Sequence, residues 1–367
     1  MARAAVGKGT RGSKPRVSII DCDIHNAVPG LEALFPYLPE RWRRHAQTIG
    51  MRGRNALAKG HVYPKSSPEA CRVDAWPSSG PPGSDLALMQ RQHLDPLGIA
   101  IGILNCLVNL GPQLNHEWAA ALSRAVNDWQ VAEWLDKDAR LRASIVVPYE
   151  YPELAVQELW RAAQAHPGFV QVLILVRTQE PLGRPGYRPI FQAASEAGLP
   201  VALHFGGTSG HAITGCGWPS FYLEDHTSMS QAFQAQLVSL VLEGVFERIP
   251  QLRVVMVEGG FAWVPPVMWR MDQHWRRLRE ETPYLRRAPS EYVRANVALT
   301  TQPMEEPEHP GHLLDLLEMM AEGPKLMFAT DYPHWDFDAP DRAFPVQIRD
   351  DARTQIYEAN ARSLYRL

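Results

Sequence analysis

The hydrophobic positions of this 367-residue chain fall into short runs rich in β-branched residues, separated by longer segments with helical periodicity. The runs lack the sustained alternation of polar and apolar residues that marks a half-exposed sheet, and are typical of parallel strands covered on both faces. Eight of them predict strands, at residues 17–23, 99–105, 142–148, 170–176, 200–205, 252–258, 295–301 and 325–331.

Amphipathic segments between these runs predict helices, at residues 116–138, 151–166, 230–249, 263–281, 312–320 and 351–367. Eight strands that alternate with helices predict an α/β fold, the (β/α)8 TIM barrel, as one domain over residues 17–367. The alternative is a doubly wound sheet, which usually has fewer strands and a glycine fingerprint after the first strand. No GxGxxG or P-loop motif follows any predicted strand, so the barrel is favoured.

Three segments depart from the alternation. Residues 1–16 are basic and lack the apolar core of a signal peptide, and we predict a disordered tail there. Residues 41–95 and 206–229 predict long loop insertions after the first and fifth strands. Both insertions would lie at the carboxyl ends of the strands, where barrels place their active sites, so we expect them to shape the pocket.

Composition narrows the class of partner. The formal net charge of -3 argues against nucleic acid or an anionic membrane as a ligand, since both usually need a basic surface. No apolar run reaches the roughly 18 residues of a membrane helix. We therefore expect a cytoplasmic protein that acts on a small molecule.

Acidic and imidazole side chains recur where predicted strands end. Asp21, Asp23 and His25 occupy alternate positions of the first strand, which predicts that they share one face. The later members of the set are His204, Glu258 and Asp331. Buried carboxylates repel one another and lose solvation unless a cation relieves both costs. Mixed nitrogen and oxygen ligands suit Zn²⁺, Fe²⁺ or Mn²⁺, so the sequence predicts a divalent-metal site.

Four motifs resemble the amidohydrolase superfamily, in particular the branch of aminocarboxymuconate-semialdehyde decarboxylase. They are D-C-D-I-H at 21–25, L-H-F-G-G at 203–207, E-G-G-F-A-W at 258–263 and F-A-T-D-Y-P-H-W-D at 328–336, and N-A-R-S-L-Y at 360–365 resembles the family's C-terminal signature. The resemblance implies a TIM barrel, a hydrolase or decarboxylase activity and a homodimer. It also implies four metal ligands, which are Asp23, His25, His204 and Asp331.

Two departures from the family pattern bear on the chemistry. Asp23 stands at a position that is His in many relatives, and its harder oxygen favours iron or manganese over zinc. Glu258 stands where many relatives have a catalytic histidine. Proton transfer would then fall to Glu258 or Asp331, unless Glu258 itself binds metal. The fourth strand ends in Arg177 and contains no lysine, so the bridging carbamylated lysine of many two-metal relatives is not expected.

Four further residues are candidates for supporting roles, each with an alternative. Asp21 would orient a ligand or cap its strand. Arg177 would bind a substrate carboxylate or pair with an acid such as Glu258. His334 would orient the site or pack with Trp335. His226 would reach the site from its loop or, like most loop histidines, lie apart from it.

Three functions are compatible with these residues. The first is a hydrolase or decarboxylase in which the metal activates water or polarises a carboxylate or carbonyl. The second is a non-haem di-iron monooxygenase, because carboxylate-rich ligand sets also hold two irons. The motifs also resemble a branch of this barrel type that hydroxylates in terpenoid antibiotic biosynthesis, which implies a terpenoid-type acyl natural product as substrate. The third is a binding barrel that has lost catalysis. Metal identity and stoichiometry distinguish them.

Overall fold

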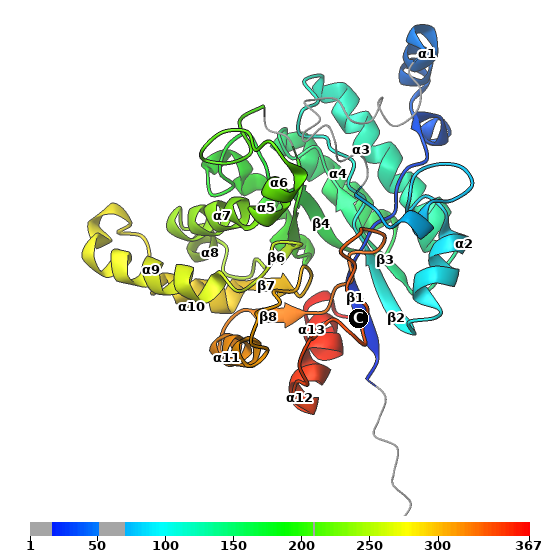
Figure 1. Cartoon of the computed structure of the whole chain (residues 1–367). Coiled ribbons are helices and arrows are strands. Elements are labelled where there is room, and N and C mark those ends of the chain that lie inside the picture. Colours follow the sequence, from blue (N-terminus) through cyan, green and yellow to red (C-terminus); the bar gives the residue numbers. More distant parts are fainter. Residues whose placement is uncertain (1–16, 51–69, 208–209) are drawn as a thin grey trace, which may run out of the picture.

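Eight parallel strands form one sheet in chain order, β1 to β8, in the computed structural model, which describes residues 17–50, 70–207 and 210–367 (Figure 1). The strands are β1 Ile19–Ile24, β2 Ile99–Leu104, β3 Leu141–Val146, β4 Phe169–Leu175, β5 Val201–His204, β6 Val254–Val257, β7 Val297–Thr300 and β8 Lys325–Met327. All eight predicted strands are confirmed. The predicted tail at 1–16 and residues 51–69 of the first insertion lie outside the described residues.

Helices lie between the strands and around the sheet (Figure 1). They are α1 Glu40–Ile49, α2 Leu86–Met89, α3 His116–Gln130, α4 Pro152–Ala165, α5 Arg188–Ala197, α6 Tyr222–Thr227, α7 Ser230–Leu242, α8 Val245–Arg248, α9 Val264–Arg277, α10 Pro289–Asn296, α11 Gly311–Met320, α12 Asp350–Thr354 and α13 Asn360–Tyr365. Shorter helical turns cover Leu31–Leu34, Val73–Ala75, Gln90–Leu94, Val131–Leu135, Pro185–Tyr187, Arg279–Glu281 and Gln355–Ala359.

The sheet curls until its first and last strands meet, which makes the predicted (β/α)8 barrel. The backbone N–H of Cys22 in β1 donates to the carbonyl of Phe328, just after β8, at 2.9 Å. This contact continues the pairing of neighbouring strands around a nearly closed ring. Segments from the two ends of the chain therefore lie side by side.

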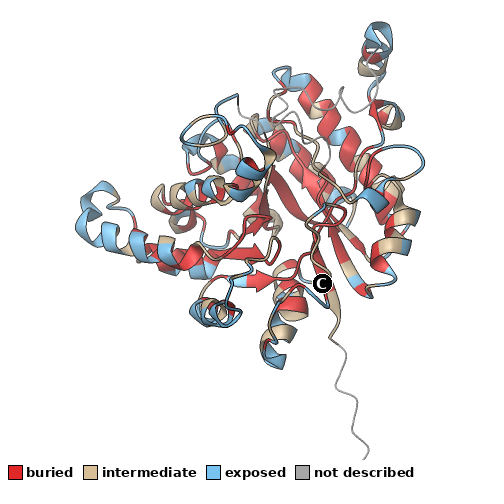
Figure 2. Cartoon of the chain, in the orientation of Figure 1, coloured by how far each residue is buried: buried red, intermediate tan, exposed pale blue. Residues whose placement is uncertain are grey.

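The burial pattern explains why the strands read as unbroken apolar runs. All seven residues of β4 are buried, and Figure 2 shows buried strands inside helices whose outer faces are exposed. The helices follow local signals as well as burial. The side chain of Asn115 accepts a hydrogen bond from the N–H of Trp118 and begins α3, whose inner face includes Leu122 and Val126.

The two predicted loop insertions are partly helical. The first contains α2 and most of α1, and the second contains α6. Helix α1 escaped prediction because it is highly charged and only Ala46 in it is buried. Helix α6 has six residues, too few for a periodic signal. Helices α5 and α10 were also not predicted.

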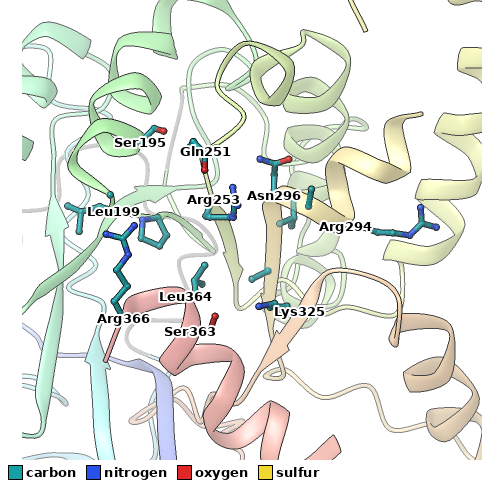
Figure 3. Close-up of a pocket in the computed structure, with 15 residues that line it drawn as sticks. Ser195, Leu199, Gln251, Arg253, Arg294, Asn296, Lys325, Ser363, Leu364 and Arg366 are labelled. Atoms are coloured by element: carbon teal, nitrogen blue, oxygen red, sulfur yellow. The ribbon is translucent and has the colours of Figure 1, made fainter. Parts of the chain in front are cut away.

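Two further observations concern the barrel as a whole. Among the described residues, no helix combines the length and apolar character needed to cross a membrane. A pocket of about 370 Å³ lies where β6, β7 and β8 begin, beside α13, and Arg253, Lys325 and Arg366 line it (Figure 3). It is therefore at the opposite end of the strands from the predicted metal ligands.

Candidate metal centre

Barrel closure brings the two ends of the predicted ligand set together. The N–H of Asp331 donates to the carbonyl of Asp23 at 3.0 Å, and the N–H of His25 donates to the carbonyl of Tyr332 at 2.7 Å. These bonds lie at the carboxyl ends of β1 and β8. The side chains of Asp23, His25 and Asp331 consequently share one buried rim.

All five predicted ligands lie in two overlapping groups. One ligand atom from each of Asp23, His25, His204 and Glu258 lies within 4.8 Å of the others. The second group keeps His25 and Glu258 and adds Asp331 and His334, within the same limit. The sequence therefore identified residues that the fold does bring together.

Backbone carbonyls orient both imidazoles. Nδ1 of His25 donates to the carbonyl of Asn105 at 2.8 Å, and Nδ1 of His204 donates to the carbonyl of Phe205 at 2.7 Å. Each ring then presents Nε2 to the carboxylates, 3.2 Å from Asp23 Oδ2 for His204 and 2.7 Å from Asp331 Oδ1 for His25. A carbonyl that holds Nδ1 is a common way to fix the ring nitrogen that binds metal.

Asn105 contacts both predicted ligands at the end of β1. Besides the carbonyl contact with His25, its Nδ2 donates to Asp23 Oδ1 at 2.8 Å. The sequence placed Asn105 at the end of the second strand but did not identify it as part of the site. Its position at the end of a buried strand was the available signal.

The surroundings shift the pKa values of Glu258 and Asp331 in opposite directions. Burial, followed by the charges of Asp331 and Asp23, raises the pKa of Glu258 well above its usual range. Burial also disfavours the Asp331 anion, but His334 and His25 outweigh it and lower the pKa of Asp331. Burial lowers the pKa of His25, while Asp23 and Asp331 raise it to about 9.

The donor set fits a divalent cation. Glu258 Oε2 and Asp331 Oδ2 are buried oxygen atoms that have no hydrogen-bond partner among the described residues. Such acceptors are costly unless a cation or a donor satisfies them. With Asp23, they provide carboxylate oxygens beside the Nε2 atoms of His25 and His204, a combination that suits Mn²⁺, Fe²⁺ or Zn²⁺.

Two residues of the cluster have strained backbones. Glu258 and Asp331 have φ angles of 61° and 63°, in the left-handed region that non-glycine residues seldom adopt. Each such residue costs on the order of 1 kcal/mol, and such strain concentrates at functional sites. Here it accompanies the two acids of the cluster whose side chains each have a buried oxygen atom without a hydrogen-bond partner among the described residues.

The predicted shared face of Asp21, Asp23 and His25 is wrong for Asp21. Asp21 pairs with Gly102 of β2, whereas Ile24 pairs with Leu104, so β1 carries one extra residue. This bulge interrupts the alternation on which the prediction rested. The Asp21 carboxylate lies 2.8 Å from Nε2 of His93, which the sequence analysis missed, and 2.6 Å from the Thr330 hydroxyl.

Arg177 follows β4 and pairs with an acidic side chain, as one of its two predicted alternatives has it, although the acid is not Glu258. Its Nη2 donates to Asp225 of α6 at 2.6 Å, not to Glu258. The guanidinium lies 4.7 Å from the ring centre of Phe205. Its Nε is buried and has no hydrogen-bond partner among the described residues.

The two outer histidines have different surroundings. His334 Nδ1 lies 2.6 Å from Asp331 Oδ1, and its ring centre lies 4.5 Å from that of His25, so it contacts the site directly. His226 lies in α6, with Nε2 3.2 Å from Oδ2 of Asp336. Trp335 Nε1 donates to Tyr222 at 2.8 Å, so α6 is joined to the segment after β8.

The amidohydrolase family profile matches residues 20–367. The chain belongs to the amidohydrolase family. The resemblance drawn from the four motifs and the prediction of an amidohydrolase-type enzyme are thus confirmed.

Two curated relatives of this amidohydrolase are both named gamma-resorcylate decarboxylase. Gamma-resorcylate decarboxylase of Rhizobium sp. strain MTP-10005 is 27% identical over 263 residues, which cover 68% of this chain and 77% of the relative. The enzyme of that name from Rhodococcus jostii strain RHA1 is 26% identical over 265 residues, covering 68% and 78%.

Solved structures share the barrel. The 5-carboxyvanillate decarboxylase of Sphingomonas paucimobilis has a TM-score of 0.68 at 20% identity, covering 96% of this amidohydrolase and 100% of that chain. The dihydroxybenzoic acid decarboxylase of Polaromonas sp. JS666, solved with manganese and the inhibitor 2-nitroresorcinol, has a TM-score of 0.67 at 21% identity, covering 96% and 98%. At these identities the likeness establishes the fold.

Proposed function

We propose that this amidohydrolase is a divalent-metal-dependent decarboxylase of a hydroxylated aromatic carboxylate. The observation that carries the proposal is the buried ligand cluster with its two orphaned carboxylate oxygens. The decarboxylase names of the curated relatives and the manganese in a related structure support the reaction class and the metal.

The metal would be held by Asp23, His25, His204 and Asp331, all of them in the two groups of potential ligands that Glu258 shares. When bound, a divalent ion acts as a Lewis acid toward the oxygens of a substrate. The protein's own part is to orient the metal-binding side chains and to exclude water from the site. The cluster is buried, and its imidazoles are fixed by backbone carbonyls.

Glu258 is the proposed proton donor. Burial and neighbouring carboxylates favour its protonated form, whereas Asp331 stays ionised beside His334. In the reaction, the proton of Glu258 goes to the ring carbon that bears the carboxylate. The bond between that carbon and the carboxylate breaks, its electron pair stays on the ring, and CO2 leaves. Solvent then returns a proton to Glu258.

The direct test is CO2 release from γ-resorcylate and 5-carboxyvanillate by manganese-loaded protein, with benzoate as the control. Release in D2O should place one deuterium on the carbon that lost the carboxylate. Hydrolysis of acyl substrates without CO2 release would assign the chain to the hydrolytic chemistry of its family. No turnover of any carboxylate would remove the proposal.

A second candidate is the di-iron monooxygenase, acting on a terpenoid-type acyl substrate. Its expected ligands lie in two groups that overlap at His25 and Glu258. These residues would hold two irons, which when bound would supply O2 activation. Two irons per chain and substrate-dependent O2 consumption would support this candidate over the decarboxylase.

A further inference from the structure

A row of buried polar side chains crosses the barrel interior from the C-terminal helix to Asp23. Tyr365 ends α13, Gln171 lies in β4, Ser144 lies in β3 and Asn105 follows β2. Tyr365 is 6% exposed and the other three are fully buried. Barrel interiors are usually filled by branched apolar side chains, so this inner polar row needs a reason.

The hydrogen bonds of the inner polar row all run in one direction. The Tyr365 hydroxyl donates to Gln171 Oε1 at 2.9 Å, which turns Gln171 Nε2 toward Asn105 Oδ1 at 3.1 Å. Ser144 Oγ accepts from Gln171 Nε2 at 2.9 Å and donates to Asn105 Oδ1 at 2.6 Å. Asn105 Oδ1 therefore receives two donors.

Those two donors decide which end of the Asn105 amide faces the metal ligand. With Oδ1 held by Ser144 and Gln171, Nδ2 must face Asp23, and it donates to Asp23 Oδ1 at 2.8 Å. A reversed amide would set its oxygen against the Asp23 carboxylate at the same spacing, between two fully buried side chains. Two buried acceptors facing each other are strongly unfavourable.

We propose that Tyr365, Gln171 and Ser144 are positioning residues that fix the Asn105 amide and, through it, the Asp23 carboxylate for metal binding. The proposal rests on the metal centre of the proposed function, not on the reaction. Asp23 Oδ1 accepts from Asn105, and Nε2 of His204 lies 3.3 Å from Oδ1 and 3.2 Å from Oδ2, so the carboxylate is held with both oxygens beside this ligand nitrogen. Partners of this kind commonly change metal affinity by about 10- to 100-fold.

The test is the Mn²⁺ dissociation constant of the full chain, measured by electron paramagnetic resonance of free Mn²⁺. Gln171→Leu and Ser144→Ala should each weaken binding about tenfold. Tyr365→Phe, which keeps the ring and removes only the first donor, should weaken it in the same direction. It serves as the decisive variant if Gln171→Leu does not fold.

Tyr357→Phe is the matched control. Tyr357 is also a buried C-terminal tyrosine, but its hydroxyl donates to the carbonyl of Pro340 at 2.8 Å, away from the inner polar row. Its loss should lower thermal stability as much as Tyr365→Phe does, with Mn²⁺ affinity unchanged. Equal affinity in Tyr365→Phe, Ser144→Ala and the wild type would overturn the proposal.

The same measurement separates this proposal from the proposed reaction. Wild-type protein that binds Mn²⁺ but releases no CO2, with weakened binding in the three variants, would support the positioning role and reject the decarboxylase. Wild-type protein that binds no divalent ion would overturn both.

Discussion

Asp331 Oδ1 lies 2.7 Å from Nε2 of His25, although 306 positions separate the two residues in the chain. The contact exists because the segment after β8 hydrogen-bonds to β1 and closes the barrel. The backbone hydrogen bonds between these two segments thereby hold together two parts of the site that are far apart in the sequence. The site is therefore as rigid as the barrel closure itself.

Asp331→Asn should abolish most turnover while the fold is kept. Asparagine preserves the shape but removes the charge that balances His25 and His334. We expect kcat to fall by at least about 100-fold. Steady-state CO2 release measures the loss, and circular dichroism checks the fold. Turnover within twofold of the wild type would remove Asp331 from the site.

Glu258→Gln should separate proton transfer from metal binding. Glutamine cannot donate a proton of the same acidity, so we expect kcat to fall by about 100- to 10,000-fold with at least one metal ion retained. Glu150→Gln is the control, since Glu150 is a partly buried acid beyond β3 that accepts from Gln179 and Tyr187 instead. Unchanged kcat in Glu258→Gln would contradict its role.

Asp21→Asn should lower the stability of the fold and leave metal binding unchanged. The carboxylate accepts from the N–H of Thr330, the hydroxyl of Thr330 and Nε2 of His93, so it joins β1 to the segment after β8. Loss of this buried charge should lower the free energy of unfolding by about 3 kcal/mol. Urea unfolding and metal analysis measure the two effects. Loss of metal without loss of stability would show that Asp21 serves the metal site.

Arg177→Lys should raise KM more than it lowers kcat. The planar guanidinium of Arg177 would bind a substrate carboxylate in a geometry that lysine does not reproduce. Loss of one charged hydrogen bond corresponds to about a tenfold rise in KM. Arg184→Lys, an exposed arginine 3.7 Å from Glu243, should change neither constant. A fall in kcat alone would argue against substrate recognition by Arg177.

Asp138→Asn should reveal an acid-sensitive contribution to stability. Hydrogen bonds from Arg140 outweigh burial and lower the pKa of Asp138 to about 2. A lowered folded-state pKa stabilises the fold above the unfolded pKa near 4, and this contribution is lost as pH falls toward 2. We expect the substitution to cost about 1 kcal/mol at pH 7 and nothing near pH 2. Chemical unfolding at both pH values checks this.

The fold was predictable because each strand is a buried apolar run with a clear length and spacing. The cluster of potential metal ligands was predictable because a barrel brings the carboxyl ends of its strands to one rim. His204 and Asp331 could be identified from two features of the sequence, which are their residue type and their place at strand ends.

The remaining features depend on spatial relations that a linear pattern does not contain. The bulge between Asp21 and Ile24 adds one residue to β1 without any sequence signature, so Asp21 was placed on the wrong face. Asn105 contacts the site through its backbone carbonyl, which any residue has, and through its side-chain amide, which depends on the residue type. The pairing of Arg177 with Asp225 depends on where the short helix α6 lies.

The metal content of the freshly purified chain is the most direct test of the proposed metal centre. We expect at least one tightly held divalent ion per chain, and its loss in a double variant of Asp23→Ala and His204→Ala. One manganese or zinc ion per chain supports the decarboxylase, and two irons per chain support the oxygenase. Protein that retains no divalent ion, even after reconstitution, would contradict the account.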